Sequence, residues 1–204
     1  MMCGLSHRRF VLAGLVLIFQ CGFGMAQTIR DVDGNTYRVM RAGRYLWMAE
    51  NLRVAHDPQG NPLSCYEIEN PYMDTCHYGF LYSWTAAMDS SQVSGTRGIC
   101  PEGWHIPTDA EWDSLAEWAG GITLAGMVLK RQGPGQFGIL MSGNYNNIQE
   151  AGYYFGEEAY FWTSDAYSLT AAWMRHFGLN RKNVNRSTVP KHYGFSIRCV
   201  RMMH

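Results

Sequence analysis

The sequence predicts an α+β domain, with helices in the first part of the mature chain and antiparallel strands in the last. Three observations support this class. A capped amphipathic helix begins at Thr108, and strand-forming runs separated by polar turns follow near the end of the chain. Four cysteines remain in a chain that begins with an export signal. We therefore expect two or more helices packed on short antiparallel strands and stapled by disulfides.

Residues 1–26 are predicted to be a secretory signal peptide. A basic region at 7–9 precedes an apolar run at 10–19, which is too short to span a membrane, and small residues mark a cleavage site at 24–26. Lipid attachment would need a small residue before Cys21, but the preceding residue is Gln20. We therefore expect cleavage after Ala26 and release outside the cell or at its surface, with the periplasm as the alternative.

The mature chain is predicted to form one domain over residues 27–204. Removing 26 of the 204 residues leaves 178, a length that suits a single domain with a sizeable core. Of the 17 basic residues Arg8 and Arg9 leave with the signal, so 15 remain against 17 acidic residues, a formal charge of −2. This balance argues against a nucleic-acid partner, and no later segment has the pattern of a transmembrane helix.

The first part of the mature chain reads as a hairpin, a loop and a short helix. Residues 36–40 and 45–48 predict two strands joined by a tight turn. Prolines and polar residues make 57–70 a loop, and 90–98 is a second loop. Apolar residues recur at helical spacing between them, so we expect a helix over 80–88.

The strongest helix signal begins at Thr108, immediately after a proline. The Thr108 hydroxyl can cap the first turn while Glu111 reaches back to the cap amide, and Gly120 and Gly121 permit a left-handed end. Four apolar residues share one face at i, i+3, i+4 and i+7, and we expect that face in the core: Trp112, Leu115, Ala116 and Ala119.

The second half of the chain is expected to alternate loops and strands. Residues 131–156 carry many glycines and no clear period, which predicts mostly loop. Three strands are expected at 160–164, 171–177 and 195–201, with 180–191 as a polar turn between the last two.

The four mature cysteines are Cys65, Cys76, Cys100 and Cys199. An even number in an exported chain favours disulfides, and four cysteines allow three connectivities. Free buried thiols are the alternative. No pair has the close spacing of a zinc site, so no metal cluster is expected from them.

Two longer runs carry a family resemblance. The segments Cys100–Trp112 and Gly194–Arg201 resemble the major paralogous domain family first named from Fibrobacter succinogenes, whose members occur in many copies on bacterial surfaces. The resemblance covers nearly the whole mature chain, since further segments agree in the family's order: Asp31–Tyr37, Trp47–Arg53, Gly79–Trp84 and Tyr160–Asp165. It implies a bridge between Cys100 and Cys199, which leaves Cys65 with Cys76.

The same motifs look like those of the C-type lectin-like fold, as elaborated in sulfatase-modifying and formylglycine-generating proteins. Those oxidases hold copper with a close cysteine pair, whereas Cys199 has no other cysteine after Cys100. We find no catalytic constellation and expect no enzyme, and His105 is expected to be a hydrogen-bonded framework residue. No cofactor is expected, although Glu69, Asn70 and Asp165 carry oxygen ligands that leave calcium as an alternative.

The seven tryptophans all lie in the mature domain. Most fall inside the family's motifs, where burying large rings stabilises a small domain, and five are therefore expected in the core: Trp47, Trp84, Trp104, Trp112 and Trp162. Trp118 lies off the apolar face of its helix, and Trp173 lies in the stretch least like the family's framework.

That stretch, residues 166–192, is the expected binding face. It combines aromatic rings with adaptable polar side chains, a composition typical of recognition surfaces, and an ordinary solvated loop is the alternative. The expected contact residues are Tyr167, Trp173, Arg175, His176, Asn180, Arg181, Asn183 and Asn185. The predicted function is an exported, noncatalytic module that binds a glycan or a surface protein. The second predicted function is a structural component of a cell-envelope assembly, and the third is an enzyme.

Overall fold

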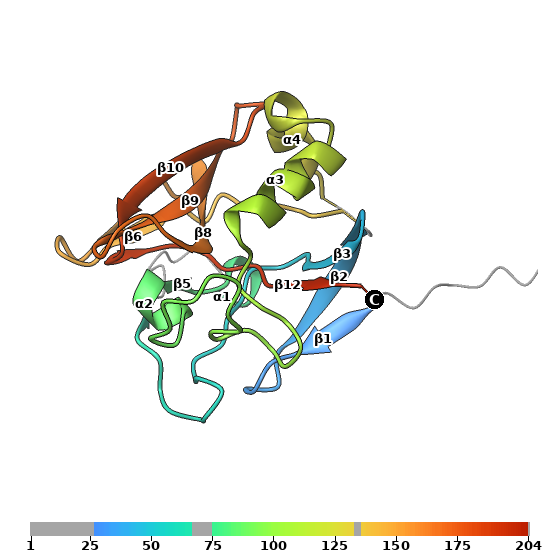
Figure 1. Ribbon diagram of the computed structural model, residues 1–204. Coiled ribbons are helices and arrows are strands. Elements are labelled where there is room, and N and C mark those ends of the chain that lie inside the picture. The colour runs from blue at the N-terminus through green and yellow to red at the C-terminus, as the bar shows by residue number, and fades with distance from the viewer. Residues whose placement is uncertain (1–26, 67–74, 133–135, 204) are drawn as a thin grey trace, which may run out of the picture.

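The computed structural model describes residues 27–66, 75–132 and 136–203, which form a mixed structure of mostly strands with a few helices (Figure 1). Short elements follow one another closely along the chain. In chain order they are β1 (Thr28–Arg30), β2 (Thr36–Ala42), β3 (Tyr45–Met48), β4 (Cys65–Tyr66), α1 (Thr75–Tyr78), β5 (Leu81–Tyr82), α2 (Trp84–Ala87), α3 (Asp109–Trp118), α4 (Ile122–Leu129), β6 (Asn144–Asn146), β7 (Ala151–Tyr153), β8 (Glu158–Ala166), β9 (Ala171–Gly178), β10 (Asn185–Pro190), β11 (Tyr193–Gly194) and β12 (Val200–Met202).

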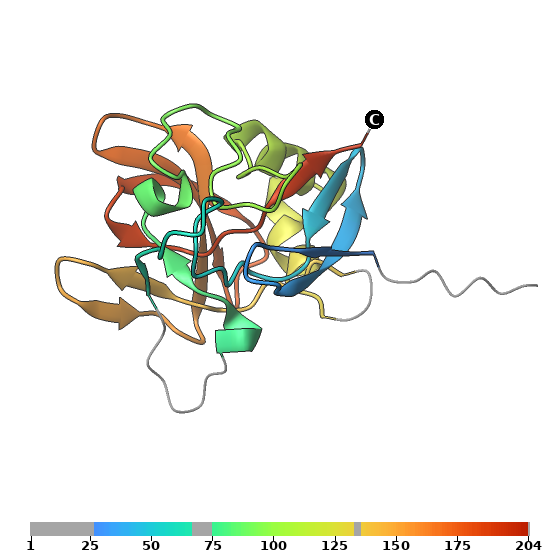
Figure 2. The same cartoon turned by 90° about the horizontal axis from the view of Figure 1, so that it is seen from below.

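The strands form four small antiparallel sheets. Their orders are β1-β2-β3-β12, β10-β9-β8, β11-β6-β7 and β4-β5. The first and last described strands therefore share one sheet, with β12 paired to β3 (Figure 2). The predicted hairpin of residues 36–40 and 45–48 is confirmed, since Val39 pairs with Met48 and Ala42 with Tyr45.

Two apolar clusters form the core, and several strands contribute to both. On β3, Leu46 and Met48 belong to one cluster while Trp47 faces the other. On β8, Trp162 belongs to the first cluster and Phe161 to the second. Because successive side chains of a strand point to opposite faces, these strands lie between two packed layers and read as continuous apolar runs.

The prediction that five tryptophans lie in the core is confirmed. Each is at most 4% exposed. Trp47 and Trp112 pack together with ring centroids 5.1 Å apart, which joins the first hairpin to α3. Trp118 is exposed, as its position off the apolar face of the helix suggested.

The capping box at the start of α3 is confirmed. The Glu111 amide donates to the Thr108 hydroxyl over 3.2 Å, and the Thr108 amide donates to the Glu111 carboxylate over 2.8 Å. The carboxylate also bonds His105 Nε2 at 2.8 Å, and the His105 amide donates to the carbonyl of Val200. His105 is therefore a hydrogen-bonded framework residue that connects the helix start to β12.

The helix predicted over residues 80–88 is wrong in its first half. Leu81 and Tyr82 pair with β4 and form strand β5 instead, and Tyr82 also exchanges two backbone hydrogen bonds with Phe195. Ser83 then caps the short helix α2 by accepting from the amide of Ala86. Pairing with a distant segment overrides the local helical period here.

The second half of the chain has more regular structure than its sequence predicts. Strands β6 and β7 and helix α4 were not expected, and β10 occupies the predicted polar turn. Strand β10 is an edge strand whose side chains are mostly exposed or half-buried, so its sequence is polar. Of the predicted strand 195–201, only the residues of β12 form a regular strand, while Phe195 and Ser196 make isolated bridges.

One disulfide is present in the described part of the chain, between Cys100 and Cys199, as the family resemblance implies. Both cysteines are buried. Cys65 lies on β4, but the side chain of Cys76 lies outside the described residues, so the pairing of Cys65 with Cys76 stays a prediction. A disulfide suits an exported protein.

The predicted signal peptide, residues 1–26, also lies outside the described residues. Within the described ranges, no helix has the length and apolar character needed to cross a membrane.

Removing the disulfide should cost much of the stability. It joins residues 99 apart in sequence, and closing such a loop stabilises the folded state by about 4 to 5 kcal/mol in the chain-entropy model. The Cys100→Ala, Cys199→Ala double variant should therefore unfold at a much lower urea concentration. Equilibrium unfolding measures this, and an unchanged midpoint would contradict the role given to the bridge.

The Glu111 interactions predict a dependence on pH. Burial alone would raise the pKa of Glu111, but hydrogen bonds from His105 and the Thr108 amide outweigh it, so the pKa lies below its usual 4.5. The stability from the charged form is complete above about pH 4.5 and is lost as pH falls through the folded pKa. Glu111→Gln should thus be less stable than the parent near pH 7, and the difference in their free energies of unfolding should decrease toward pH 3. Urea unfolding at several pH values measures this difference, and a difference that does not change with pH would contradict the role of the Glu111 charge.

Candidate functional site

A hollow lies where the start of α3 meets the strands β8, β9 and β10. We call it the α3 hollow, and its volume is about 570 Å³. Figure 1 shows α3 beside the sheet of these three strands. The lining residues come from the loop before α3, from the helix and from the strands: Ser94, Thr108, Asp109, Ala110, Asp113, Asp165, Ala166, Trp173 and Arg186.

Asp165, near the end of β8, fixes one wall of the α3 hollow. One carboxylate oxygen accepts a 2.5 Å hydrogen bond from the Ser94 hydroxyl, and the other accepts a 2.5 Å bond from the backbone amide of Asp109. The amide belongs to the first turn of α3, where the helix has no internal acceptor for it. Asp165 thereby ties the preceding loop and the helix start to β8.

Asp109 lies at the centre of the charged groups. One of its oxygens accepts from Arg175 over 2.6 Å, and the other accepts from Arg186 Nε over 2.6 Å. Arg175 also bonds the Asp109 carbonyl at 2.9 Å and the Asp113 carboxylate at 2.8 Å. The Arg175 side chain is only 1% exposed, whereas that of Asp113 is 57% exposed. Arg175 therefore supports the hollow from beneath, and Asp113 is open to a ligand.

Arg186 and Trp173 form the opposite wall. The guanidinium carbon of Arg186 lies 3.3 Å from the centre of the Trp173 ring, a cation–π contact between neighbouring strands. The ring of Tyr167 meets Trp173 edge to face at 5.3 Å. The Arg186 side chain is 40% exposed, so its guanidinium offers donors that Asp109 does not use.

The chemistry of the α3 hollow suits hydrogen bonding to a polar ligand. Its three carboxylates accept hydrogen bonds and the Arg186 guanidinium donates them, while the Ser94 hydroxyl, which donates to Asp165, can accept one, and Trp173 adds an apolar surface. The set of described lining residues contains neither a histidine nor a cysteine.

The sequence-predicted contact residues do not gather at one place. Trp173 lines the α3 hollow, Tyr167 packs beside it, and Arg175 is buried beneath it. The remaining members lie elsewhere on the β9–β10 hairpin. Those in the turn beyond β9, at the opposite end of the hairpin, are Asn180, Arg181 and Asn183.

His176 and Asn185 are register partners whose side chains face away from α3. His176 stacks on Tyr160 at 4.7 Å and lies 3.0 Å from the Glu158 carboxylate. Burial lowers the pKa of His176 despite this carboxylate, and burial with the Glu158 contact raises the pKa of Tyr160. Asn185 accepts a 2.7 Å bond from Asn183. These residues form a packed cluster apart from the α3 hollow.

Asp109, Asp113 and Ser94 are site residues that the sequence reasoning missed. One signal was present: Asp109 and Asp113 are four residues apart, so their carboxylates share one helix face and repel each other. Such a pair is stable when a cation lies between the carboxylates, and Arg175 fills that place. Asp165, one of the residues named for the calcium alternative, accepts hydrogen bonds from Ser94 and from the amide of Asp109.

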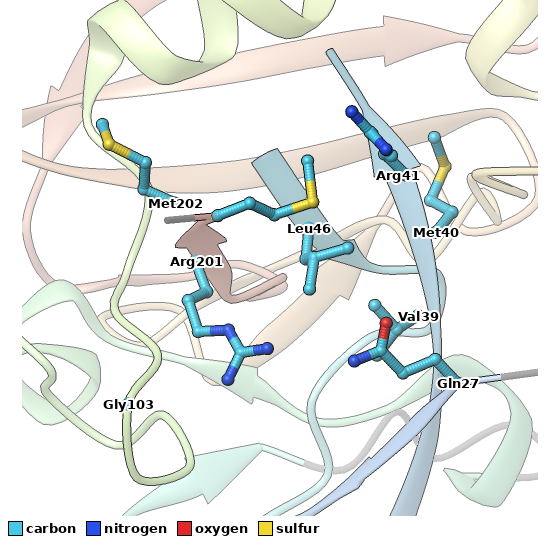
Figure 3. A pocket seen from close by; sticks show the side chains of 9 residues that line it. Gln27, Val39, Met40, Arg41, Leu46, Gly103, Arg201 and Met202 are labelled. Carbon is cyan, nitrogen blue, oxygen red and sulfur yellow. The ribbon is translucent and has the colours of Figure 1, made fainter. Parts of the chain in front are cut away.

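A second hollow of about 930 Å³ lies at the sheet formed by β1, β2, β3 and β12, where Arg41, Leu46 and Arg201 are register partners. In Figure 3 the side chains of Arg201 and Gln27 lie on opposite sides of Leu46, while Arg41 points in another direction. Arg201 is near the ring of Trp104, with its guanidinium carbon 5.4 Å from the centroid. None of the sequence-predicted contact residues lines this hollow.

Calcium remains an untested alternative. Glu69 and Asn70 lie outside the described residues. Within the described ranges, no group of three or more histidine, cysteine or acidic side chains is placed to hold a metal ion.

The family of the chain follows from its sequence. The model of the Fibrobacter succinogenes major domain matches residues 40–201. The chain belongs to this family. The match includes every residue that lines the α3 hollow. A search of curated proteins finds no match, and neither does a search of solved structures.

The ion pairs beneath the hollow predict a stability effect in this Fibrobacter-type domain. Asp109→Ala would leave the buried Arg175 guanidinium with the carboxylate of Asp113, which is largely solvated, and with the backbone carbonyl of residue 109, and should destabilise the fold by about 3 kcal/mol. Glu117→Ala, at an exposed position of the same helix, should change stability by less than about 0.5 kcal/mol. Urea unfolding compares the two, and equal effects would show that Asp109 does not balance Arg175.

Proposed function

We propose that this protein is an exported, noncatalytic binding module of C-type lectin-like fold that recognises a glycan at the α3 hollow. The observation that carries the proposal is the convergence of exposed Asp113 and Arg186 and half-buried Trp173 on one hollow from three different elements. Carboxylates and guanidinium groups bond sugar hydroxyls, and an aromatic ring can pack against the apolar face of a sugar. The buried disulfide is consistent with export.

The charge of the α3 hollow favours a neutral ligand. Asp109, Asp113 and Asp165 carry three negative charges, and Arg175 and Arg186 carry two positive ones. The N-terminus of α3 adds a partial positive charge of about half an elementary charge. The near balance gives no net attraction for a strongly charged ligand, while the directional donors and acceptors remain available to hydroxyl groups.

Preorganisation also supports recognition. Asp109 holds the Arg186 guanidinium, and Asp165 holds the helix start, before a ligand arrives. Side chains that are already fixed lose little further rotational freedom when they bind.

A surface protein is the second candidate partner. The turn between β8 and β9 projects beside the α3 hollow and carries Tyr167, 61% exposed, and Leu169, 96% exposed. Exposed apolar residues at a loop tip suit a protein contact. A role in an envelope assembly and an enzymatic role are the remaining alternatives, and no contact in the α3 hollow favours either.

The test is a glycan array probed with residues 27–204, with calcium and with a chelator. We expect binding to a neutral glycan, and Asp113→Asn and Arg186→Ala should each weaken it at least tenfold because charge-assisted hydrogen bonds are lost. Arg30→Ala is the matched control, since Arg30 is an exposed arginine on β1 in a different sheet. Loss of binding with the chelator would add calcium to the site.

Two outcomes would overturn the glycan proposal. The first is a folded protein that binds no glycan in either buffer. The second is an affinity for the glycan that is the same in Asp113→Asn, Arg186→Ala and the control Arg30→Ala. Capture of a surface protein that requires Tyr167 and Leu169 would then support the second candidate.

A further inference from the structure

One end of the molecule exposes several large apolar side chains. They come from the last turn of α3, from α4 and from the turn between β9 and β10, and each is between 38% and 53% exposed: Trp118, Ile122, Leu124, Met127 and Leu179. We call residues 117–132 together with 178–184 the α4 end. Figure 1 shows α4 beside the β9–β10 turn at this end of the molecule. An apolar surface of this kind in a folded protein indicates an interaction site.

The two segments of the α4 end pack as one unit. The Met127 amide donates to the carbonyl of Lys182 over 2.9 Å, and the Val184 amide donates to the carbonyl of Ile122 over 3.0 Å. Gly126 makes this approach possible, because a Cβ atom there would lie 2.3 Å from the Asn183 carbonyl oxygen. The apolar residues therefore sit on a backbone held at both ends of α4.

Lys130 fixes the start of the turn. Its ammonium group donates to the carbonyls of Gly178, Leu179 and Arg181 at 2.6 to 2.7 Å. These three acceptors use all three donors of the side chain. The Lys130 ammonium group is thus bound by the backbone of the turn, and the side chains of Leu179 and Arg181 are exposed.

The rim of the α4 end is basic. Arg131, Arg181 and Lys182 are exposed, whereas the segments 117–132 and 178–184 contain one acidic residue, Glu117. Two acidic neighbours lie outside these segments: Glu157 accepts a 2.7 Å backbone hydrogen bond from Leu179, and Glu158 on β8 is the register partner of Gly178. The α4 end therefore carries an excess of positive charge, although the mature chain has a formal charge of −2.

The exposed apolar side chains and the basic rim of the α4 end together indicate the kind of partner. A second copy of the chain would bring two basic rims toward each other, and repulsion between them opposes that pairing. A purely ionic polymer would leave the apolar side chains without a partner. An anionic lipid bilayer meets both needs, because apolar side chains enter the interface while arginine and lysine reach the headgroups.

We propose that the α4 end is a docking surface that places this domain on a bilayer containing anionic lipids. Trp118, Leu124 and Met127 enter the headgroup boundary, and Arg181 and Lys182 bond the lipid phosphates. Docking of this kind is reversible and weakens as salt rises, because each cation acts through a screened attraction. The surface shares no residue with the lining of the α3 hollow, whose hairpin residues Trp173 and Arg186 lie within β9 and β10 and not in the turn.

The experiment is flotation of residues 27–204 with two kinds of vesicle, phosphatidylcholine alone and phosphatidylcholine mixed with phosphatidylglycerol. We expect flotation with the anionic vesicles at low salt and release at high salt. Arg181→Gln with Lys182→Gln should weaken the partition at least fivefold for each charge removed. Leu124→Ser with Met127→Ser should also weaken it at least tenfold, because two apolar side chains leave the interface.

The matched control is Arg30→Gln, which removes an exposed charge from β1 and should float as the parent does. Circular dichroism and the urea midpoint establish that each variant is folded. Three results would overturn the proposal: no flotation of folded protein, equal flotation with both vesicle types, or a concentration-dependent dimer that Leu124→Ser with Met127→Ser abolishes. The Arg186→Ala variant should float normally, so a failure of lipid docking and a failure of glycan binding are distinguishable.

Discussion

The extended segment 195–200 holds the domain together. Its backbone bonds Tyr82 on β5, Tyr160 and Trp162 on β8, Leu52 after the first hairpin, and His105 before α3. These partners come from four separate parts of the chain. Because the segment lies inside the molecule, each of its polar backbone groups needs such a partner, and moving the segment would break bonds to several elements at once.

Arg198 shows what burial of this segment requires. Its guanidinium donates to the Asn51 side chain at 2.8 Å and to the carbonyls of Phe137 and Gly138. Burial lowers the pKa of Arg198 to about 9, so the group keeps its charge near pH 7. Neutral acceptors hold this cation in a fixed geometry, and Asn51 in turn donates to the hydroxyl of Ser196. Residues from the two family motifs at 47–53 and 194–201 thus provide each other's buried polar side chains with hydrogen-bond partners.

Sequence reasoning was reliable where a local interaction determines the structure. The capping box at Thr108 and Glu111 involves residues three positions apart, and the turn of the first hairpin is equally local. Burial of the tryptophans follows from their size and surroundings. The Cys100–Cys199 pairing came from the family resemblance, because cysteine spacing alone left three connectivities open.

The predictions from the sequence were wrong where pairing with a residue distant in the chain determines the backbone conformation. Pairing with β4 makes a strand of Leu81 and Tyr82, and pairing with β9 makes a strand of the polar residues 185–190. The composition of 166–192 included Trp173, which lines the α3 hollow, but strand alternation sends Arg175 and His176 to opposite faces. Residues 180–183 are separated from Trp173 by the length of β9. The carboxylates of the hollow come from α3, and no periodicity within 166–192 could place that helix.

The β9–β10 hairpin connects two surfaces with different electrostatics. At the α3 hollow, Asp109 and Asp113 already balance the charges of Arg175 and Arg186, so little net charge remains to attract an ion. At the α4 end, Lys130 binds backbone carbonyls and no carboxylate among the described residues pairs with Arg181. Binding at the first surface should therefore depend on hydrogen-bond geometry and be insensitive to salt, whereas binding at the second should decrease with ionic strength. Because the hairpin is a continuous ladder between them, a domain docked at the α4 end would hold the α3 hollow at a fixed distance from the bilayer.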